Sequence, residues 1–196
     1  MEIGVLSLQG DFKNHIDILK ELDVDVKEVR YSDDLSSVDG LIIPGGESTA
    51  ISNLIAKQGL YKDIKKFVDT KPVYGTCAGL ILLSSRIINN NLKKNIRLFK
   101  VLDITVERNG WGRQINSFLE NIKIKPFKKD YKAIFIRAPK IKSVSNEIDI
   151  LSKFSDTAIM IRKGYILGTT FHPELTDDMR VHEYFINMIK EYKAEC

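Results

Sequence analysis

The sequence predicts an α/β fold, in which a mostly parallel central sheet is covered by helices on both faces and carries an antiparallel excursion at one edge. Two observations predict it. Short apolar runs alternate with helix-period segments through the first half of the chain, as strand–helix–strand units do. In the second half, strand-like runs follow one another with few helices between them, which is typical of antiparallel pairing.

The first half alternates strands and helices in a regular order. Three of its strands are short apolar runs that end in a turn containing glycine, as buried parallel strands do, and the strand 24–29 alternates apolar and charged residues. The segment from Phe12 to Leu22 has apolar residues at helical spacing, and Glu47-Ser48-Thr49 offers capping side chains for a second helix. The expected strands are 3–8, 24–29, 40–43 and 72–74, and the expected helices are 12–22, 49–57, 60–68 and 80–83.

The second half is expected to supply the remaining central strands, the antiparallel excursion and a final helix over 177–192. Val181, Tyr184, Phe185 and Met188 lie at core-facing spacing on that helix. No repeat or Pro/Ser-rich linker divides the chain, so we expect a single domain over residues 1–196. The expected strands here are 98–106, 114–124, 133–137, 148–154, 158–162 and 165–170.

Composition excludes several classes of function. The chain has 196 residues, 43% hydrophobic and 29% charged, with a formal net charge of +4. Its lysines are scattered, and the basic runs at 93–94 and 123–132 are more typical of solvated surface than of a nucleic-acid site. The N-terminus carries an acidic residue and only a short apolar run, so we expect neither a secretory signal nor a membrane segment and predict a cytoplasmic protein.

The two cysteines have different settings. Cys196 ends the chain, whereas Cys77 lies in Gly75-Thr76-Cys77-Ala78-Gly79, between an expected strand and an expected helix. The spacing Gly-x-nucleophile-x-Gly describes the strained elbow that holds a nucleophile above a sheet, with the Ala78 N–H placed to contact an oxyanion. A buried core cysteine beside a glycine turn explains the same spacing equally well.

A histidine favours the catalytic interpretation. His172-Pro173-Glu174 follows an expected strand, and the proline fixes the local backbone so that Glu174 can face the imidazole. Cysteine, histidine and carboxylate at two loops of one sheet edge supply the nucleophile, base and orienting group that acyl transfer needs.

Pro44-Gly45-Gly46-Glu47-Ser48-Thr49 follows another strand and can expose backbone N–H groups. Such a loop suits either a phosphate cradle or one arm of an oxyanion hole. No lysine follows the glycines, as it does in Walker-type loops, so the oxyanion role fits better.

These three blocks together resemble the class I, or triad, glutamine amidotransferases, and more closely the branch that serves pyridoxal 5′-phosphate synthase as its glutaminase subunit. The resemblance runs from residue 4 to about residue 185. It implies a three-layer, flavodoxin-like fold. Further matching blocks are Gly4-Val5-Leu6, Leu8-Gln9-Gly10, Val106-Glu107-Arg108-Asn109, Gly112-Arg113-Gln114, Phe135-Ile136-Arg137-Ala138-Pro139, and Glu174-Leu175-Thr176 followed by Arg180.

The resemblance also implies roles for residues. Cys77 attacks the side-chain amide of L-glutamine, His172 transfers protons and Glu174 orients His172. Gly46 and Ala78 supply the oxyanion hole, the first after a peptide flip that a partner can induce. The implied glutamine-binding residues are Gly46, Glu47, Ser48, Arg108, Ile136 and Arg137. Without the resemblance, surface ion pairs would explain Arg108 and Arg137.

A separate partner follows from the same resemblance. Ammonia would pass to a (β/α)₈-barrel synthase subunit that makes pyridoxal 5′-phosphate, in a large hetero-oligomer with a dodecamer of each subunit. No cofactor or metal is expected in this chain's own site. Two alternatives remain: the glutaminase of another amidotransferase, such as imidazole glycerol phosphate synthase, or a non-catalytic regulatory subunit. His15 is expected on a helix surface or interface, and His182 is expected to cap or pack.

Overall fold

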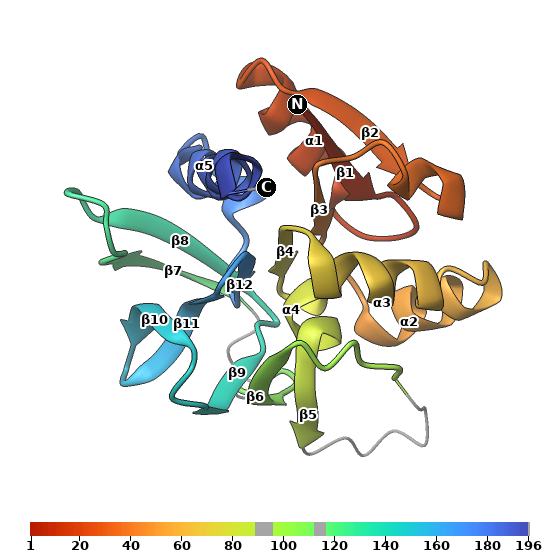
Figure 1. Cartoon of the computed structure of the whole chain (residues 1–196). Helices are drawn as coiled ribbons and strands as arrows, with labels where there is room; N and C mark the ends of the chain where they lie inside the picture. The colour runs from red at the N-terminus through yellow and green to blue at the C-terminus, as the bar shows by residue number, and fades with distance from the viewer. Residues whose placement is uncertain (89–95, 112–116, 196) are drawn as a thin grey trace.

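A computed structural model of the chain describes residues 1–88, 96–111 and 117–195 and is built around a seven-stranded sheet (Figure 1). Five strands run parallel in the order β2-β1-β3-β4-β12, the flavodoxin-like order. The expected fold is thereby confirmed. These strands are β1 (Glu2–Leu6), β2 (Asp25–Val29), β3 (Gly40–Ile43), β4 (Val73–Thr76) and β12 (Ile166–Thr169).

The antiparallel excursion lies at one edge of this sheet, as the sequence predicts. There β11 (Thr157–Lys163) pairs antiparallel with β12, and β10 (Asp149–Phe154) pairs antiparallel with β11. The turn between β11 and β12 is short, which a hairpin allows and a parallel connection does not.

Helices cover both faces of the sheet. On one face lie α2 (Ser48–Lys57), α3 (Tyr61–Thr70) and α4 (Ala78–Leu83), and on the other lie α1 (Phe12–Glu21) and α5 (Arg180–Glu195). Short 3₁₀ helices η1 (Ser32–Leu35) and η2 (Pro173–Leu175) precede β3 and α5.

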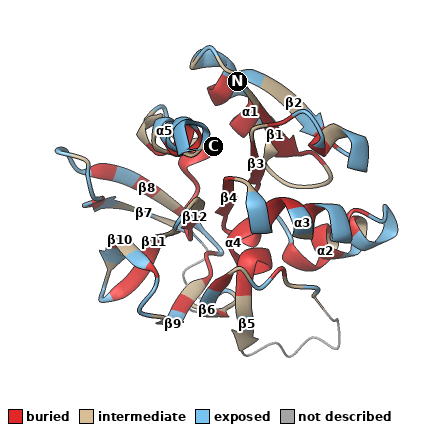
Figure 2. Cartoon of the chain, in the orientation of Figure 1, coloured by how far each residue is buried: buried red, intermediate tan, exposed pale blue. Residues whose placement is uncertain are grey.

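Strand β3 has no polar side chain because both of its faces are buried. Leu41 and Ile43 pack in the core under α2, α3 and α4, whereas Ile42 packs in the core under α1 and α5. Successive strand residues point to opposite faces, so a strand covered on both sides must be apolar at every position. The central strands are accordingly buried along their length (Figure 2).

Two strands escaped the sequence prediction. β5 (Ser84–Ile88) continues directly from α4, and β9 (Lys140–Val144) is half polar; both pair with β6 (Leu102–Glu107) in a separate three-stranded sheet. A third, two-stranded sheet contains β7 (Ser117–Ile122) and β8 (Tyr131–Ile136). The start of the strand expected from residue 114 lies outside the described residues, as do the block Gly112–Gln114, the basic run at 93–94 and Cys196.

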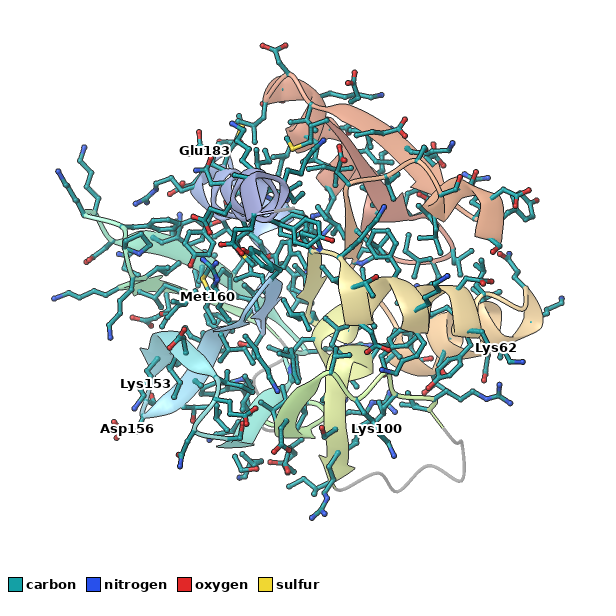
Figure 3. The ribbon with its side chains drawn as sticks, in the orientation of Figure 1. Lys62, Lys100, Lys153, Asp156, Met160 and Glu183 are labelled. Atoms are coloured by element: carbon teal, nitrogen blue, oxygen red, sulfur yellow. The ribbon has the colours of Figure 1, made fainter. Side chains whose placement is uncertain are left out.

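The basic run 123–132 turns its aromatic residues inward. Tyr131 is fully buried, and the guanidinium of Arg180 lies 5.0 Å from the ring of Phe127 and 5.5 Å from that of Tyr131. These rings are therefore covered rather than available for base stacking. Lysines elsewhere, such as Lys62, Lys100 and Lys153, lie at the periphery, whereas Met160 lies in the interior (Figure 3).

Candidate active site

The carboxyl ends of the parallel strands open into a cleft of about 500 Å³. Loops after β1, β3, β4 and β12 meet there, because the carboxyl ends of parallel strands share one edge of a sheet. The cleft collects eight of the ten residues that the sequence singled out. It is lined by Gln9, Gly10, Asp11, Gly46, Glu47, Ser48, Cys77, Ile81, Arg108, Asn109, Ile136, Arg137 and His172.

Cys77 stands on a strained turn between β4 and α4. Its φ of 47° and ψ of −98° lie in a region that residues with a side chain rarely occupy. Its N–H donates to the carbonyl of Thr169 on the neighbouring strand β12 at 2.8 Å, which ties the turn to the strand that leads to His172. The geometry is that of a nucleophile elbow.

The glycines beside Cys77 allow this turn to pack closely. A Cβ on Gly79 would lie 2.0 Å from the carbonyl oxygen of Ile43, and one on Gly75 would lie 2.7 Å from the backbone of Gly79. The helix α4 therefore rests against β3 at a distance that only glycine permits.

His172 and Glu174 form a buried pair. Nδ1 of the His172 ring lies 2.6 Å from Oε1 of Glu174. The backbone N–H of His172 donates to the carbonyl of Ile134 at 2.8 Å. Because Nδ1 is engaged by Glu174, Nε2 is the ring nitrogen available to Cys77; it has no oxygen or nitrogen partner among the described residues.

The charge on this histidine depends on both neighbours. Burial lowers the pKa of His172, but the interactions with Cys77 and Glu174 outweigh burial and raise that pKa to about 11. The imidazole is therefore protonated at neutral pH. An imidazolium beside a cysteine is the arrangement that activates a thiol nucleophile.

Asp11 adds a further carboxylate near the same ring nitrogen that Glu174 binds. Its Oδ2 lies 3.8 Å from Nδ1 of His172. Ligand atoms of Asp11, His172 and Glu174 all lie within 4.8 Å of one another, the spacing of a metal site. Since Nδ1 is already bound to Glu174 at hydrogen-bond distance, this group is better explained as the hydrogen-bonded His172–Glu174 pair with a third carboxylate nearby.

Glu47 and Arg108 form another part of the cleft lining. Glu47 caps α2 by accepting from the N–H groups of Thr49 and Ala50, and Nη2 of Arg108 lies 2.8 Å from its Oε1. Burial raises the pKa of Glu47, but these donors together outweigh it and lower that pKa. The side-chain carbonyl of Gln9 accepts from the Glu47 N–H at 3.0 Å, which fixes the loop to the end of β1.

The remaining expected residues differ in how they meet the cleft. Ser48 offers a buried hydroxyl that has no partner among the described residues. Ile136 is 38% exposed, unusual for isoleucine, and Arg137 follows it with a φ of 43° at the end of β8. Ala78 is buried and does not line the cleft, so only its backbone can serve a ligand. Glu174 lies behind His172 rather than in the cleft.

Five residues that line the cleft were not among the expected site residues, and one other residue, His15, was misplaced. Gln9, Gly10 and Asn109 were named only within matching blocks, without a role. Asp11 and Ile81 line the cleft; Asp11 precedes α1 directly, so its position after a strand end was an available signal. His15 was expected at a surface or interface but is fully buried. That expectation was wrong because α1 turns His15 toward the sheet, where Thr76 and His182 bind its ring. His182 is buried and packs, as expected.

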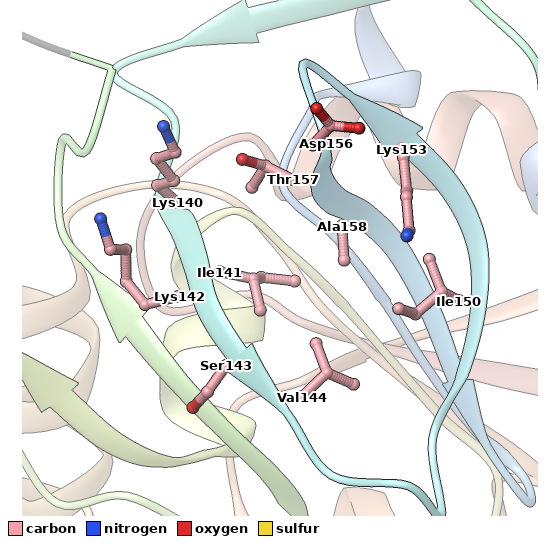
Figure 4. Close-up of a pocket in the computed structure, with 10 residues that line it drawn as sticks. All are labelled: Lys140, Ile141, Lys142, Ser143, Val144, Ile150, Lys153, Asp156, Thr157 and Ala158. Carbon is pink, nitrogen blue, oxygen red and sulfur yellow. The ribbon is translucent and has the colours of Figure 1, made fainter.

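A second cavity, of about 420 Å³, lies between β9 and the hairpin β10–β11 (Figure 4). Lys140 and Lys142 extend from β9 on one side and Lys153 from β10 on the other. None of its ten lining residues is a cysteine or a histidine, so it does not offer the nucleophile and base that the first cleft brings together. Within the part of the chain that the structure covers, no helix has the length and apolarity needed to cross a membrane.

Known proteins share both the sequence and the fold. The chain is 46% identical to the "Pyridoxal 5′-phosphate synthase subunit PdxT" of Thermosipho africanus over 97% of its own length and 100% of the relative's. It is 48% identical to the protein of that name from Fervidobacterium nodosum, over 98% and 100% of the two lengths. A crystal structure described as a glutamine amidotransferase superposes with a TM-score of 0.90 at 37% identity, covering 96% of this chain and 98% of that one.

A more distant structure agrees in fold alone: a glutamine amidotransferase from Thermotoga maritima superposes with a TM-score of 0.58 at 14% identity, over 100% and 84% of the two chains. The SNO glutamine amidotransferase family matches residues 5–191, which is nearly the whole sequence. The chain therefore belongs to the SNO glutamine amidotransferase family.

Proposed function

We propose that the cleft binds L-glutamine and hydrolyses its side-chain amide to L-glutamate and ammonia. The observation that carries the proposal is the arrangement of Cys77, His172 and Glu174. The imidazole of His172 interacts with Cys77 on its strained turn and with the buried carboxylate of Glu174. Family membership and relatives named as subunits of pyridoxal 5′-phosphate synthase support the same reaction.

The reaction proceeds in two halves. The Cys77 sulfur attacks the amide carbon, and His172 gives the proton on Nε2 to the leaving nitrogen, so that ammonia departs and a thioester remains. Water then attacks the thioester carbon while Nε2 accepts a proton from it. Cleavage of the carbon–sulfur bond releases glutamate and restores the thiolate–imidazolium pair. Glu174 keeps Nδ1 in place throughout.

Two backbone N–H groups are assigned to the oxyanion. Ala78 follows the nucleophile, as one donor does in nucleophile elbows. Gly46 supplies the other; its φ is 149°, and the preceding carbonyl, of Gly45, accepts from the Asp11 N–H at 3.2 Å. One backbone hydrogen bond therefore holds this peptide, and a partner that displaces the Gly10–Asp11 segment can reorient it.

The substrate's amino-acid end is assigned to the part of the cleft that Arg108, Arg137 and Glu47 line. Arg108 and Arg137 are cations that suit the α-carboxylate of glutamine, and Glu47 suits its ammonium group. The Ser48 hydroxyl, which has no partner in the described part of the chain, and the exposed Ile136 complete the binding surface together with Gly46.

The partner we propose is a (β/α)₈-barrel synthase subunit that uses the ammonia to build pyridoxal 5′-phosphate, in a hetero-oligomer with a dodecamer of each subunit. Ammonia released into water is mostly protonated and no longer nucleophilic, so direct transfer between subunits preserves it. The first helix, α1, and the loop around Gly46 form the proposed docking face, because this loop and the segment that leads into α1 both border the cleft.

The test measures glutamate release from glutamine with and without the barrel subunit. We expect slow release alone, faster release with the partner, and none from Cys77→Ala in either condition. Cys196→Ser is the matched control and should keep full activity. Activity that survives Cys77→Ala would overturn the assignment. Activation only by the imidazole glycerol phosphate synthase subunit would show that the chain is the glutaminase of that amidotransferase instead.

A further inference from the structure

Glu174 has a second buried neighbour besides His172. Oε1 bonds to His172, whereas Oε2 lies 3.6 Å from Nε2 of His15, and both side chains are completely shielded from solvent. No hydrogen bond reaches Oε2 from any described residue. A buried carboxylate oxygen without a hydrogen bond is costly. Whether His15 Nε2 carries a hydrogen or a lone pair therefore affects the stability of the Glu174 carboxylate.

His15 is held on both of its nitrogens. Nε2 lies 3.2 Å from the hydroxyl oxygen of Thr76 on β4, and Nδ1 lies 2.9 Å from Nε2 of His182 on α5. The ring also stands edge-on to Tyr74, with ring centroids 6.2 Å apart. Side chains of two elements, β4 and α5, therefore fix its position beside Glu174.

The charge of Glu174 selects the tautomer of His15. If Nε2 carries the hydrogen, its N–H donates to Thr76 and turns a positive dipole toward Oε2. If Nδ1 carries it, a nitrogen lone pair faces a carboxylate oxygen 3.6 Å away, which is repulsive.

His182 selects the same tautomer independently. Its Nδ1 is buried and has no partner among the described residues. With the His15 hydrogen on Nε2, His182 donates from its own Nε2 to His15 Nδ1, and the orphaned Nδ1 is a bare acceptor. In the other tautomer that orphan is an N–H donor, and orphaned buried N–H groups are rarer than orphaned acceptors.

Both rings remain neutral. Burial lowers the pKa of His15 well below its ordinary value, helped by His182 and His172, and burial lowers the pKa of His182 to about 4. A neutral donor steadies the carboxylate without competing with the His172 imidazolium for its negative charge.

We propose that His15 is a positioning residue for the triad: its Nε2–H dipole steadies Oε2 of Glu174, and His182 fixes the tautomer that presents it. The consequence for catalysis rests on the proposed glutaminase function. Oε1 then stays directed at His172 Nδ1, which keeps Nε2 aimed at the reacting atoms.

Two substitutions of similar polarity separate positioning from packing. In His15→Gln an amide nitrogen reaches the place of Nε2, whereas in His15→Asn it reaches only the place of Nδ1. We expect His15→Asn to lower kcat for glutamate release by about 10- to 100-fold with little change in KM, because misalignment of a catalytic group acts on the chemical step. His15→Gln should restore most of the lost kcat.

Thermal unfolding of both variants provides the structural comparison. If both variants lose kcat in proportion to the fall in their melting temperatures, or if neither loses it, the positioning role is overturned. Absence of glutamate release by the wild-type complex would instead remove the proposed function.

A second readout needs no activity. Side-chain ¹⁵N NMR of the wild-type protein should find His15 neutral with its hydrogen on Nε2, and His15→Gln identifies its signals by their loss. A hydrogen on Nδ1 would overturn the proposal whatever the enzyme assay gives.

Discussion

The imidazole of His172 packs directly against the α-carbon of Gly45. A Cβ on Gly45 would lie 2.6 Å from Cε1 and 3.0 Å from Nδ1 of the ring, closer than van der Waals contact allows. The loop after β3 therefore limits the position of the ring at its Cε1–Nδ1 edge, the edge that Glu174 also binds. The glycine does this by lacking a side chain.

Gly45→Ala should reduce catalysis much more than it reduces stability. The added methyl group pushes the His172 ring, so that its Nδ1 no longer points at Glu174. Displacement of a catalytic group by about 1 Å can cost on the order of 10²-fold in rate. Glutamate release in the partner complex measures it, with kcat and KM determined separately.

Gly164→Ala is the matched control for that substitution. Nothing lies within 4 Å of a Cβ at Gly164, and the turn is remote from the cleft. It should cost about 1 kcal/mol of stability, because its φ of 53° is strained for alanine, and leave kcat intact. Equal kcat losses in the two variants would contradict the contact argued for Gly45.

Arg108→Ala should raise the KM for glutamine by about 10- to 100-fold while changing kcat little, because a hydrogen bond between charged groups contributes about 1.5–3 kcal/mol. Arg108 borders the cleft and already holds a carboxylate, that of Glu47. Steady-state kinetics of the complex tests this. Arg30→Ala, which removes an exposed pair with Glu28, is the control and should leave KM unchanged. A fall in kcat at constant KM would assign Arg108 to the chemistry instead.

Gly79→Ala should destabilise the fold by about 2–3 kcal/mol, the usual cost of overpacking. The new Cβ would lie 2.0 Å from the carbonyl oxygen of Ile43, and backbone cannot rotate aside as a side chain can. Urea unfolding gives the free energy, and cleft activity should fall with it because α4 carries Cys77 at its start. A variant of unchanged stability would show that α4 can shift freely.

His182→Leu should weaken the dependence of stability on acid. Burial lowers the pKa of His182 to about 4 in the folded state, against 6.5 when unfolded. The unfolded chain therefore binds more protons between these values, so stability falls as pH decreases from 6.5 towards 4. The wild type should lose about 2 kcal/mol from this group between pH 7 and pH 5.

Urea unfolding at the two pH values tests that loss. His15 adds a loss in the same direction and remains in the variant, so we expect a smaller slope rather than a flat one. An unchanged slope would mean that His182 takes up its proton over the same pH range in the folded and unfolded states.

The sheet and most of the cleft were predictable because local pattern and chain order determine them. A strand that is apolar at every position, such as Gly40–Ile43, must be covered on both faces, and parallel strands bring their carboxyl ends together. The loops holding Gly46, Cys77 and His172 therefore had to meet.

What escaped prediction depends on contacts between distant segments. β9 is half polar, so only its pairing with β6 identifies it as a strand. The helical period of α1 assigns His15 no apolar role, and its burial follows from polar partners on β4 and α5, 61 and 167 residues away. Periodicity carries no information about such a pairing.

The pairing of β4 with β12 also has a consequence for how the protein acquires its activity. The Cys77 N–H bonds to Thr169, so nucleophile and base become neighbours only when strands at sequence positions 73 and 166 have zipped together. Closing so long a loop is slow compared with forming local structure. During refolding, helix content should therefore return before glutamine turnover does. The recovery of enzymatic activity would then report when β4 and β12 have paired.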